Sequence, residues 1–373
     1  MNATRTRTRA AQTPIQRLSV AAYTVPTDAP EADGTFAWEA TTIVVVHVEA
    51  GGERGIGYTY ADLATAKLIQ EHLAAVVCGG DALAVQRAWW AMTRAVRNLG
   101  RPGISAMAVS AVDVALWDLK ARLLELPLAT LLGAVHDEVP VYGSGGFTSY
   151  SIQRLQQQLA GWTEAGIPRV KMKIGSHPQD DLERVTAARE AIGDDAALFV
   201  DANGAYARKQ ALAQAERFYE RAAVSWFEEP VSSEDLEGLR LLRDRAPAGI
   251  EIAAGEYGYE PAYFRRMLAA GAVDVAQADA TRCGGITGLL AVAALCQAHQ
   301  IPLSAHCAPQ LHAHACCAIG PLRHLEYFHD HVRVERLLFD GALTASGGAL
   351  RPDRSRPGLG IELKSHDAEE FAA

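Results

Sequence analysis

The sequence lacks the features that mark membrane, nucleic-acid-binding and dinucleotide-binding proteins. Its unbroken apolar runs, such as IVVV at 43–46, are far shorter than the roughly 20 residues that a transmembrane helix needs. It has no basic stripe, since 44 acidic residues stand against 35 basic ones and the formal net charge is -9. It also has no GxGxxG or Walker sequence. Neither nucleic acid nor a membrane is therefore an expected partner.

Cysteine is also scarce, and its spacing is not that of a zinc site. The six cysteines include no CxxC pair and follow no secretory signal, which favours buried free thiols in a reducing cytoplasm. The first dozen residues, MNATRTRTRAAQ, are basic and contain no apolar segment. Such a segment is typical of a disordered tail rather than of a targeting peptide.

What the chain does contain is a series of short apolar segments that end in ionisable residues. The first is RVKMKIG at 169–175, in which Lys171 and Lys173 share one face if the segment is a β-strand. Alone, this pair would suit a solvated edge strand. The later segments, however, follow at intervals of about 20 to 30 residues, the length of one strand and one helix. They end at Asp201, Glu228, Glu256, Asp279, His306 and Glu326.

The alternation of strands and helices predicts an α/β fold with a (β/α)8-type barrel, a modified TIM barrel. A doubly wound sheet alternates too, but it would place its chemistry beside a phosphate-binding turn. In a barrel the functional groups sit at the C-terminal ends of the strands, where the ionisable residues fall. Strands are expected at 139–142, 169–174, 197–201, 225–228, 250–254, 274–277, 302–305 and 322–326. Helices are expected between them at 152–165, 180–192, 207–222 and 285–299.

The segments outside the barrel predict an α+β capping domain. Strands are expected at 15–24 and 41–49, joined by an acidic segment at 26–37 that we interpret as a mobile substrate lid. The Gly- and Pro-rich C-terminal segment is expected to return to this domain and pair there through a strand near 360–364. Helices are expected near 64–77, 84–98 and 105–124. The predicted boundaries are 1–134 for the capping domain, 135–340 for the barrel and 341–373 for the C-terminal segment.

Three acidic residues at consecutive strand ends indicate a metal site. Asp201, Glu228 and Glu256 would converge at the barrel mouth, where three carboxylates repel one another unless a cation lies between them. Oxygen ligands suit a hard divalent ion, so Mg2+ is expected, with Mn2+ as the alternative. Each residue alone would equally suit a surface or helix-capping carboxylate. Glu229 competes with Glu228, although strand alternation favours Glu228.

The remaining strand ends provide two candidate bases. Asp279 would hold one imidazole nitrogen of His306 and raise the basicity of the other. Lys173 is the second base if Lys171, a nearby cation and partial burial lower its pKa by roughly three units, about 4 kcal/mol. Lys171 would stay charged and contact a substrate carboxylate. Other histidines compete with His306 on sequence grounds, namely His312, His314, His324, His329 and His331.

These motifs resemble the enolase superfamily, and within it the mandelate racemase branch. The resemblance rests on KMKIG, FVDANGAY, WFEEP, AGE, QADATRCGGITG, SAH and HLE, with SAVDVALWDLKARLLELPLATLLG in the front block. It implies that the three acidic residues bind the metal, and that Lys173 and the His306–Asp279 dyad act on opposite faces of the substrate. It also implies that Lys171 is an electrostatic partner of the substrate carboxylate or on the metal side, and that Glu326 is the acid that hydrogen-bonds the developing enolate.

The resemblance also bears on substrate contacts and on the branch. Asn203 matches a polar residue that the branch places beside the first metal ligand, and Tyr257, after the third ligand, departs from the branch's racemase pattern; both are candidate substrate contacts. In the muconate lactonizing branch a catalytic lysine stands five residues before the position of Gly284 here, but this chain has Asp279 there. Asp279 at this position therefore indicates the mandelate racemase branch, which uses a His–Asp dyad. A homo-oligomer is implied as well, with an octamer as one form.

The reaction implied by the resemblance is removal of a proton from the carbon next to a carboxylate, through a metal-stabilised enediolate. The acids of the expected lid favour a small, hydroxylated carboxylic acid as partner. Our prediction is a Mg2+-dependent dehydratase of a sugar acid, which expels the β-hydroxyl as water. A racemase or epimerase of a 2-hydroxy acid, working by two-base 1,1-proton transfer, is the alternative. A non-catalytic barrel that only binds ligands is a remote alternative, because the set of ionisable groups is complete.

Overall fold

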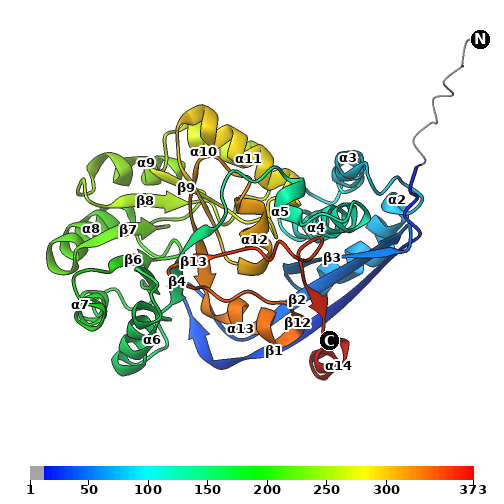
Figure 1. The fold of residues 1–373 in the computed structure, drawn as a ribbon. Coiled ribbons are helices and arrows are strands. Elements are labelled where there is room, and N and C mark those ends of the chain that lie inside the picture. Colours follow the sequence, from blue (N-terminus) through cyan, green and yellow to red (C-terminus); the bar gives the residue numbers. More distant parts are fainter. Residues whose placement is uncertain (1–11) are drawn as a thin grey trace, which may run out of the picture.

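The computed structural model describes residues 12–373, so the basic N-terminal tail expected above lies almost wholly outside the described residues. Figure 1 shows a barrel of strands and helices with a cap against one side. The cap is built from the N-terminal third of the chain, and the C-terminal segment runs from the barrel back to it. Within residues 12–373, no helix is both long and apolar enough to cross a membrane.

The barrel strands pair in parallel in chain order, and the last of them closes the ring against the first. The predicted fold class, a (β/α)8-type barrel with an α+β cap, is confirmed. A further short strand, β13 (Ala349–Leu350), pairs antiparallel with the first barrel strand. The barrel strands are β4 (Val139–Gly145), β5 (Arg169–Lys173), β6 (Ala197–Asp201), β7 (Val224–Glu228), β8 (Glu251–Ala254), β9 (Val275–Ala278), β10 (Leu303–Ala305) and β11 (Leu322–Phe328).

Alternation along these strands places two carboxylates above an aromatic layer inside the barrel. Phe199 of β6 and Trp226 of β7 stack with ring centroids 5.2 Å apart. Side chains two residues apart on a strand share a face, so Asp201 and Glu228, which end the same strands, face the same way. Trp226 Nε1 donates to Glu228 Oε2 at 3.0 Å. The rings thus fill the barrel beneath the acidic residues.

Each barrel strand is followed by a helix. Four of these helices, α6, α7, α8 and α11, lie where the sequence predicted them, whereas α9, α10, α12 and α13 were expected from the barrel count without predicted bounds. These four have only 8 to 10 residues, so the helical period repeats too few times to define their ends. The helices are α6 (Ile152–Glu164), α7 (Asp181–Ile192), α8 (Arg208–Ala222), α9 (Leu236–Arg245), α10 (Pro261–Ala269), α11 (Gly285–His299), α12 (Pro309–Cys316) and α13 (His329–Leu338).

The cap sheet corrects the prediction for the lid. β1 (Arg17–Ala32) and β2 (Ala37–Ala50) pair antiparallel, and they include most of the segment that we expected to be a mobile loop. The pairing shifts register between Pro26 and Glu31 and then resumes, so only the tip at 33–36 is a turn. Asp33 Oδ1 holds this turn by accepting hydrogen bonds from the backbone N–H groups of Thr35 and Phe36. The lid is therefore the end of a long β-hairpin.

The third cap strand, β3 (Glu53–Tyr60), was not predicted because two glycines interrupt its apolar pattern. Both lie against helix α4 (Ile104–Leu123): a Cβ on Gly55 would stand 2.4 Å from the Ala115 oxygen, and one on Gly57 would stand 2.3 Å from the Ala111 oxygen. The glycines thus permit strand and helix to pack closely. The other cap helices are α1 (Leu63–Leu68), the π-helical turn η1 (Ile69–Leu73), α2 (Ala74–Val77), α3 (Val85–Ala95) and α5 (Leu128–Leu131).

The C-terminal segment reaches the cap, but its strand pairs elsewhere than expected. β14 (Glu362–Leu363) pairs antiparallel with β12 (Phe339–Asp340), directly after the barrel, and not with the cap sheet. Contact with the cap is made instead by Leu359, whose N–H donates to Asp118 Oδ1 of α4 at 2.6 Å. The chain ends in α14 (Ser365–Ala368) and a 3-10 turn, η2 (Glu369–Phe371). The domain boundaries stated above stay a prediction.

The cysteines are free thiols, as expected, and five of the six are buried. Cys78, at the end of α2, is exposed, which corrects the expectation that all are buried. Most of the buried thiols pack in the apolar core around the barrel. Cys307 is different, because it lines a polar cavity.

Candidate active site

The ionisable residues predicted from the sequence gather at the C-terminal ends of the barrel strands. Going round the ring in strand order, the lysines of β5 come first, followed by one carboxylate each at β6, β7 and β8. The dyad comes next, at the ends of β9 and β10, and a last carboxylate lies on β11. All of them are buried: Lys171, Lys173, Asp201, Glu228, Glu256, Asp279, His306 and Glu326.

Three carboxylates form a compact cluster. Oxygen atoms of Asp201, Glu228 and Glu256 lie within 4.8 Å of one another. Glu229 is buried beside them, and its Oε1 has no hydrogen-bond partner. Burial, and next the charge of Asp201, raise the pKa of Glu228 to about 8. Hard oxygen donors at this spacing, with an orphaned carboxylate oxygen next to them, fit a divalent ion such as Mg2+.

The two lysines are held by this acidic cluster. Lys171 is fully buried, and its Nζ lies 2.6 Å from Glu228, 2.8 Å from Glu326 and 3.5 Å from Asp201. Lys171 thus lies beside two candidate metal ligands, and its pairing with a substrate carboxylate stays a prediction. Lys173 Nζ donates to Asp201 Oδ2 at 2.5 Å. Burial, the largest influence, lowers the pKa of Lys173, but the carboxylates of Asp201, Glu256 and Glu326 together outweigh burial and raise it. The lowered pKa expected from the sequence involves a bound cation and stays a prediction.

The histidine dyad has the expected geometry. His306 Nδ1 lies 2.8 Å from Asp279 Oδ2, and the other oxygen of Asp279 accepts hydrogen bonds from the N–H and hydroxyl of Thr281, both at 2.7 Å. The carboxylate is thus fixed in place. It orients the imidazole so that Nε2 is the free nitrogen.

The free Nε2 of His306 lies among acidic groups. It is 3.1 Å from Glu256 Oε2 and 3.6 Å from Glu326 Oε2. Burial alone would lower the pKa of His306, but the neighbouring Cys307 and these carboxylates raise it well above its ordinary value. Of the competing histidines, His312 accepts the Ala280 N–H and is structural. The others lie outside this ion-pair network.

A cavity of about 490 Å³ opens onto these groups. Lys173, Glu256, His306 and Glu326 line it, and so do both candidate substrate contacts, Asn203 and Tyr257. The lid tip and the cap sheet also line this cavity, through Asp33, Phe36, Trp38, Thr41 and Tyr60.

Sequence reasoning missed one cation of this cavity, Arg282. Its guanidinium lies 3.5 Å from Glu256 Oε1 and 5.3 Å from the centre of the Tyr257 ring. Its side chain is 22% exposed, whereas Lys171 is fully buried. The residue stands inside the motif QADATRCGG, three positions after Asp279, so a signal was present. It does not end a strand, and a search restricted to strand ends passes over it.

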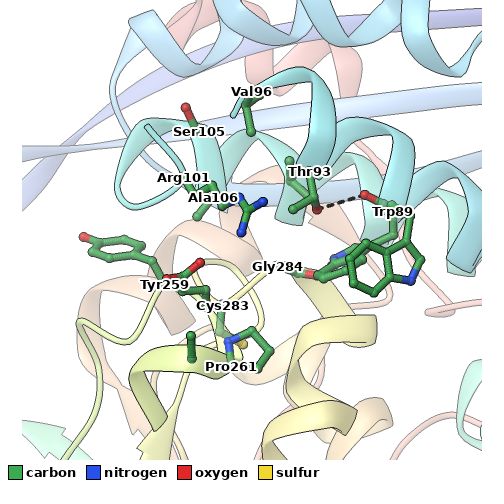
Figure 2. A pocket seen from close by; sticks show the side chains of 14 residues that line it. Trp89, Thr93, Val96, Arg101, Ser105, Ala106, Tyr259, Pro261, Cys283 and Gly284 are labelled. Atoms are coloured by element: carbon green, nitrogen blue, oxygen red, sulfur yellow. Dashed lines mark hydrogen bonds between the residues drawn. The ribbon is translucent and has the colours of Figure 1, made fainter. Parts of the chain in front are cut away.

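A second cavity, of about 210 Å³, lies between the cap and the barrel (Figure 2). The cap contributes Trp89 and Trp90 of α3, and the barrel contributes Pro261 and the turn at Cys283. Trp89 Nε1 donates to the Gly284 carbonyl at 2.7 Å. None of the acidic residues, lysines or histidines described above lines this cavity. It is an apolar space at the junction of the two parts.

The chain matches two models of known families. Residues 17–133 match the N-terminal domain of mandelate racemase / muconate lactonizing enzyme, and residues 154–368 match the "Enolase C-terminal domain-like" model. The chain belongs to the mandelate racemase/muconate lactonizing enzyme family. The resemblance inferred from the motifs is thereby confirmed, and it places the chain in the enolase superfamily.

Members of the mandelate racemase/muconate lactonizing enzyme family resemble the chain over nearly its whole length. A mandelate racemase/muconate lactonizing enzyme-like protein from Rubrobacter xylanophilus is 61% identical, with a TM-score of 0.95 over 96% of this chain and 100% of that one. A 3,6-anhydro-alpha-L-galactonate cycloisomerase from Streptomyces coelicolor is 31% identical over 94% of this chain and 97% of its own length. An L-talarate/galactarate dehydratase from Salmonella typhimurium is 32% identical over 86% of this chain and 80% of its own. A structure of that dehydratase liganded with Mg and L-lyxarohydroxamate has a TM-score of 0.88, at 28% identity over 100% of this chain and 96% of that one.

Proposed function

We propose that this protein is a Mg2+-dependent dehydratase of a sugar acid. The observation that carries the proposal is that Lys173 and His306 line one cavity, with an acidic cluster between their strands in the ring. Two proton-transferring groups can thus reach one substrate from different sides. The relative from Salmonella, named a dehydratase of sugar diacids and solved with Mg, supports both the reaction class and the ion.

The chain's own residues divide the work as follows. Asp201, Glu228 and Glu256 would hold the divalent ion, which would stabilise negative charge developing on a substrate carboxylate and compete with Lys173 for Asp201. Lys173 then takes the proton from the carbon next to the carboxylate. His306, held by its dyad partner, gives its Nε2 proton to the β-hydroxyl, which leaves as water. The resulting enol rearranges to a 2-keto-3-deoxy acid.

The remaining cavity residues suit a hydroxylated acid. Arg282 provides a guanidinium fork that can pair with a carboxylate, and it joins Lys171 as a candidate for that contact. Asn203 Oδ1 is buried and has no hydrogen-bond partner, so it can accept from a substrate hydroxyl. Tyr257 and Asp33 add polar groups to the same wall. These polar groups can bind the hydroxyls of a sugar acid, and aromatic side chains such as Phe36, Trp38 and Phe328 complete the lining.

Isomerisation is the second candidate function. Racemisation or epimerisation of a 2-hydroxy acid needs a proton-transferring group on each face of the same carbon, and Lys173 and His306 provide such a pair. The Streptomyces relative, named a cycloisomerase, also favours this class. After the proton is removed, dehydration expels the β-hydroxyl as water, whereas racemisation or epimerisation returns a proton to the opposite face of the same carbon.

A product assay on a panel of sugar acids separates these reactions. Dehydration yields a 2-keto-3-deoxy acid, whereas isomerisation in D2O incorporates deuterium with no loss of water. We expect Lys173→Ala and His306→Asn to lower the rate of dehydration by at least about 100-fold, the range of general acid–base contributions. The exposed Lys209→Ala and His299→Asn are matched controls and should retain the wild-type rate. Dehydration that survives in both site variants contradicts the proposal.

Self-association and location are further parts of the proposal. We infer a homo-oligomer, as the family resemblance implied, and large apolar side chains exposed on the surface, such as Trp90 and Leu99, support association. Light scattering on the purified protein measures the number of subunits. The free thiols support a reducing compartment such as the cytoplasm.

A further inference from the structure

A second cluster of ligand atoms lies on the wall of the same cavity, beside the three-carboxylate cluster. It consists of His306, Cys307 and Glu326, all of which line the cavity. Cys307 Sγ is 3.3 Å from His306 Nε2 and 3.3 Å from Glu326 Oε2, and these two atoms are 3.6 Å apart. Nitrogen, sulfur and oxygen thus converge on one point.

These separations match the edges of a zinc tetrahedron. Zn–S bonds are about 2.3 Å long, and Zn–N and Zn–O bonds about 2.0–2.2 Å, so at a tetrahedral angle the sulfur stands roughly 3.5–3.7 Å from either other ligand atom, and nitrogen stands roughly 3.3–3.5 Å from oxygen. The two observed sulfur separations are about 0.2 Å shorter than this, and the nitrogen–oxygen separation is about 0.1 Å longer, so small side-chain shifts complete the geometry. Three protein ligands leave the fourth position for water or another ligand from the cavity.

The other atoms of each side chain are already engaged, as the supporting partners of metal ligands are. His306 Nδ1 is held by Asp279 at 2.8 Å, which leaves Nε2 for the cluster, 3.1 Å from Glu256 Oε2. Glu326 Oε1 accepts a hydrogen bond from Ser144 Oγ at 2.6 Å and faces Lys171 Nζ at 2.8 Å, which leaves Oε2 for the cluster, where it also accepts the Cys307 N–H. Both ligand atoms are thus oriented before any ion binds.

The backbone conformation at Cys307 is unusual. Cys307 has φ of 52°, and Ala308 has φ of 41°, a left-handed conformation that favours glycine. The turn is held by Glu326 Oε2 and His331 Nδ1, which each accept a backbone N–H of these residues at 3.2 Å. Strained residues of this kind cluster at functional sites. Here the conformation directs a thiol at the catalytic imidazole.

We propose that His306, Cys307 and Glu326 form a binding site for a thiophilic divalent cation of the Zn2+ or Cd2+ class, and that its occupation stops the reaction. The cation coordinates Nε2 of His306, Sγ of Cys307 and Oε2 of Glu326, and both the thiol and Nε2 release their protons to solvent. Nε2 then no longer carries a transferable proton. Hard ions such as Mg2+ prefer the carboxylate cluster, so the two sites select by ligand softness. The inhibitory part rests on the proposed function, and the binding part does not.

The binding test uses Cys78→Ser as the parent protein, because it removes the one exposed thiol. With saturating Mg2+ present, we expect this parent to take up one Zn2+ per chain, and to show a thiolate-to-cobalt absorption band when titrated with Co2+. Adding Cys307→Ser or Cys307→Ala should abolish the band and weaken Zn2+ uptake by at least about 100-fold, the upper end of the loss caused by removing a mere supporting residue. The buried Cys296→Ser is the matched control and should keep both.

Two results overturn the site: a cobalt band that persists without Cys307, and Zn2+ uptake that only displaces Mg2+ and is unaffected by the Cys307 substitutions. Circular dichroism establishes that both Cys307 variants are folded, and either folded variant is sufficient for the test. Inhibition is measured separately, as the Zn2+ concentration that halves the rate of the Mg2+-loaded parent. A cobalt band in a protein without dehydratase activity overturns the proposed function and leaves the cation site standing.

Discussion

At the scale of single residues, the balance of neighbouring charges decides what each lysine can do. Lys171 is surrounded by three carboxylates and is fully buried, so it compensates charge beneath the site. Removing one partner of such a buried pair costs about 3–5 kcal/mol. Lys173 has one short contact, to Asp201, and reaches the cavity. Lys171 and Lys173, two positions apart on β5, thus have different roles.

Arg282 is the cation that the cavity offers to a substrate carboxylate, and its replacement tests that contact. Arg282→Lys keeps the charge but loses the planar fork, and a lost charge-assisted hydrogen bond is worth about 1.5–3 kcal/mol. We expect KM to rise by about 10- to 100-fold, with a smaller change in kcat. Steady-state kinetics on the substrate found in the product assay measure both parameters.

The exposed Arg265→Lys is the matched control for Arg282→Lys and should leave KM unchanged. If KM is unchanged in Arg282→Lys while kcat collapses, Arg282 supports the catalytic groups and does not bind the substrate. Its contacts with Glu256 and Asp279 would then be its main task.

The sequence could predict the strand-end residues of the site but not the loop residues. Period-two alternation and regular spacing are local, so Asp201, Glu228 and His306 could be identified without a structure. Arg282 and Cys307 lie in the loops after β9 and β10, where no periodicity indicates which way a side chain points. The raised pKa of Lys173 in the folded chain could not be predicted either, because it depends on a contact with Asp201 that only the folded chain shows.

At the scale of elements, the lid is a rigid hairpin end that docks onto the barrel loops. Gly34, at its tip, faces the Ala202 and Ile174 carbonyls, which follow β6 and β5. An added Cβ would stand 2.3 Å and 2.6 Å from these two oxygens. The tip therefore lies directly on the loops that carry the first metal-ligand candidate and the catalytic lysine candidate.

Gly34→Ala should lift the lid from the cavity without unfolding the protein. Backbone oxygens cannot move aside as a flexible side chain can, so the tip itself has to shift. We expect kcat/KM to fall by about 10-fold or more, because closing lids position substrate and exclude water. The melting temperature should change little, since the tip contributes few core contacts.

Gly161→Ala is the matched control for the lid variant, because a Cβ at that position meets nothing within 4 Å. It should keep wild-type kcat/KM. Wild-type kinetics in Gly34→Ala would show that the docked position of the tip does not matter for turnover.

At the scale of the whole molecule, what the sequence could not predict is how the cap, the tail and the barrel join. The barrel follows from local alternation, and its expected strands lie where the structure has them. The strand β3 and the partner of β14 were missed because long-range packing determines them: Gly55 and Gly57 fit α4, and β14 pairs with a strand that precedes it by about 20 residues.

Buried acids hold the cap to the barrel. Asp113 of α4 accepts hydrogen bonds from the N–H and hydroxyl of Thr287, at the start of α11, at 3.0 and 2.7 Å. Glu335 of α13 accepts the Tyr58 hydroxyl of β3 at 2.7 Å. The acceptors in these contacts are carboxyl groups, so the junction between cap and barrel depends on the protonation of Asp113 and Glu335.

Asp113 makes the stability of this junction depend on pH. Burial raises the pKa of Asp113 to about 7, against the opposing hydrogen bonds from Thr287 and Ile286. The folded chain thus retains a proton that the unfolded chain releases near pH 4, so stability falls as pH rises and is flat again above about pH 7. Ionisation of Asp113 should lower the free energy of unfolding by on the order of 4 kcal/mol between pH 4 and 8.

Asp113→Asn removes this ionisation and keeps the shape of the side chain. The free energy of unfolding is measured in urea at pH 5 and pH 8. We expect the value for the variant minus that for the wild type to be about 2–3 kcal/mol larger at pH 8 than at pH 5. The variant can be less stable than the wild type at pH 5, where its amide replaces a protonated carboxyl. Asp137→Asn, whose side chain is 92% exposed, is the control and should show no such change. A difference between Asp113→Asn and wild type that is the same at both pH values would mean that Asp113 is ionised in the folded protein throughout, and that hydrogen bonds from α11 outweigh its burial.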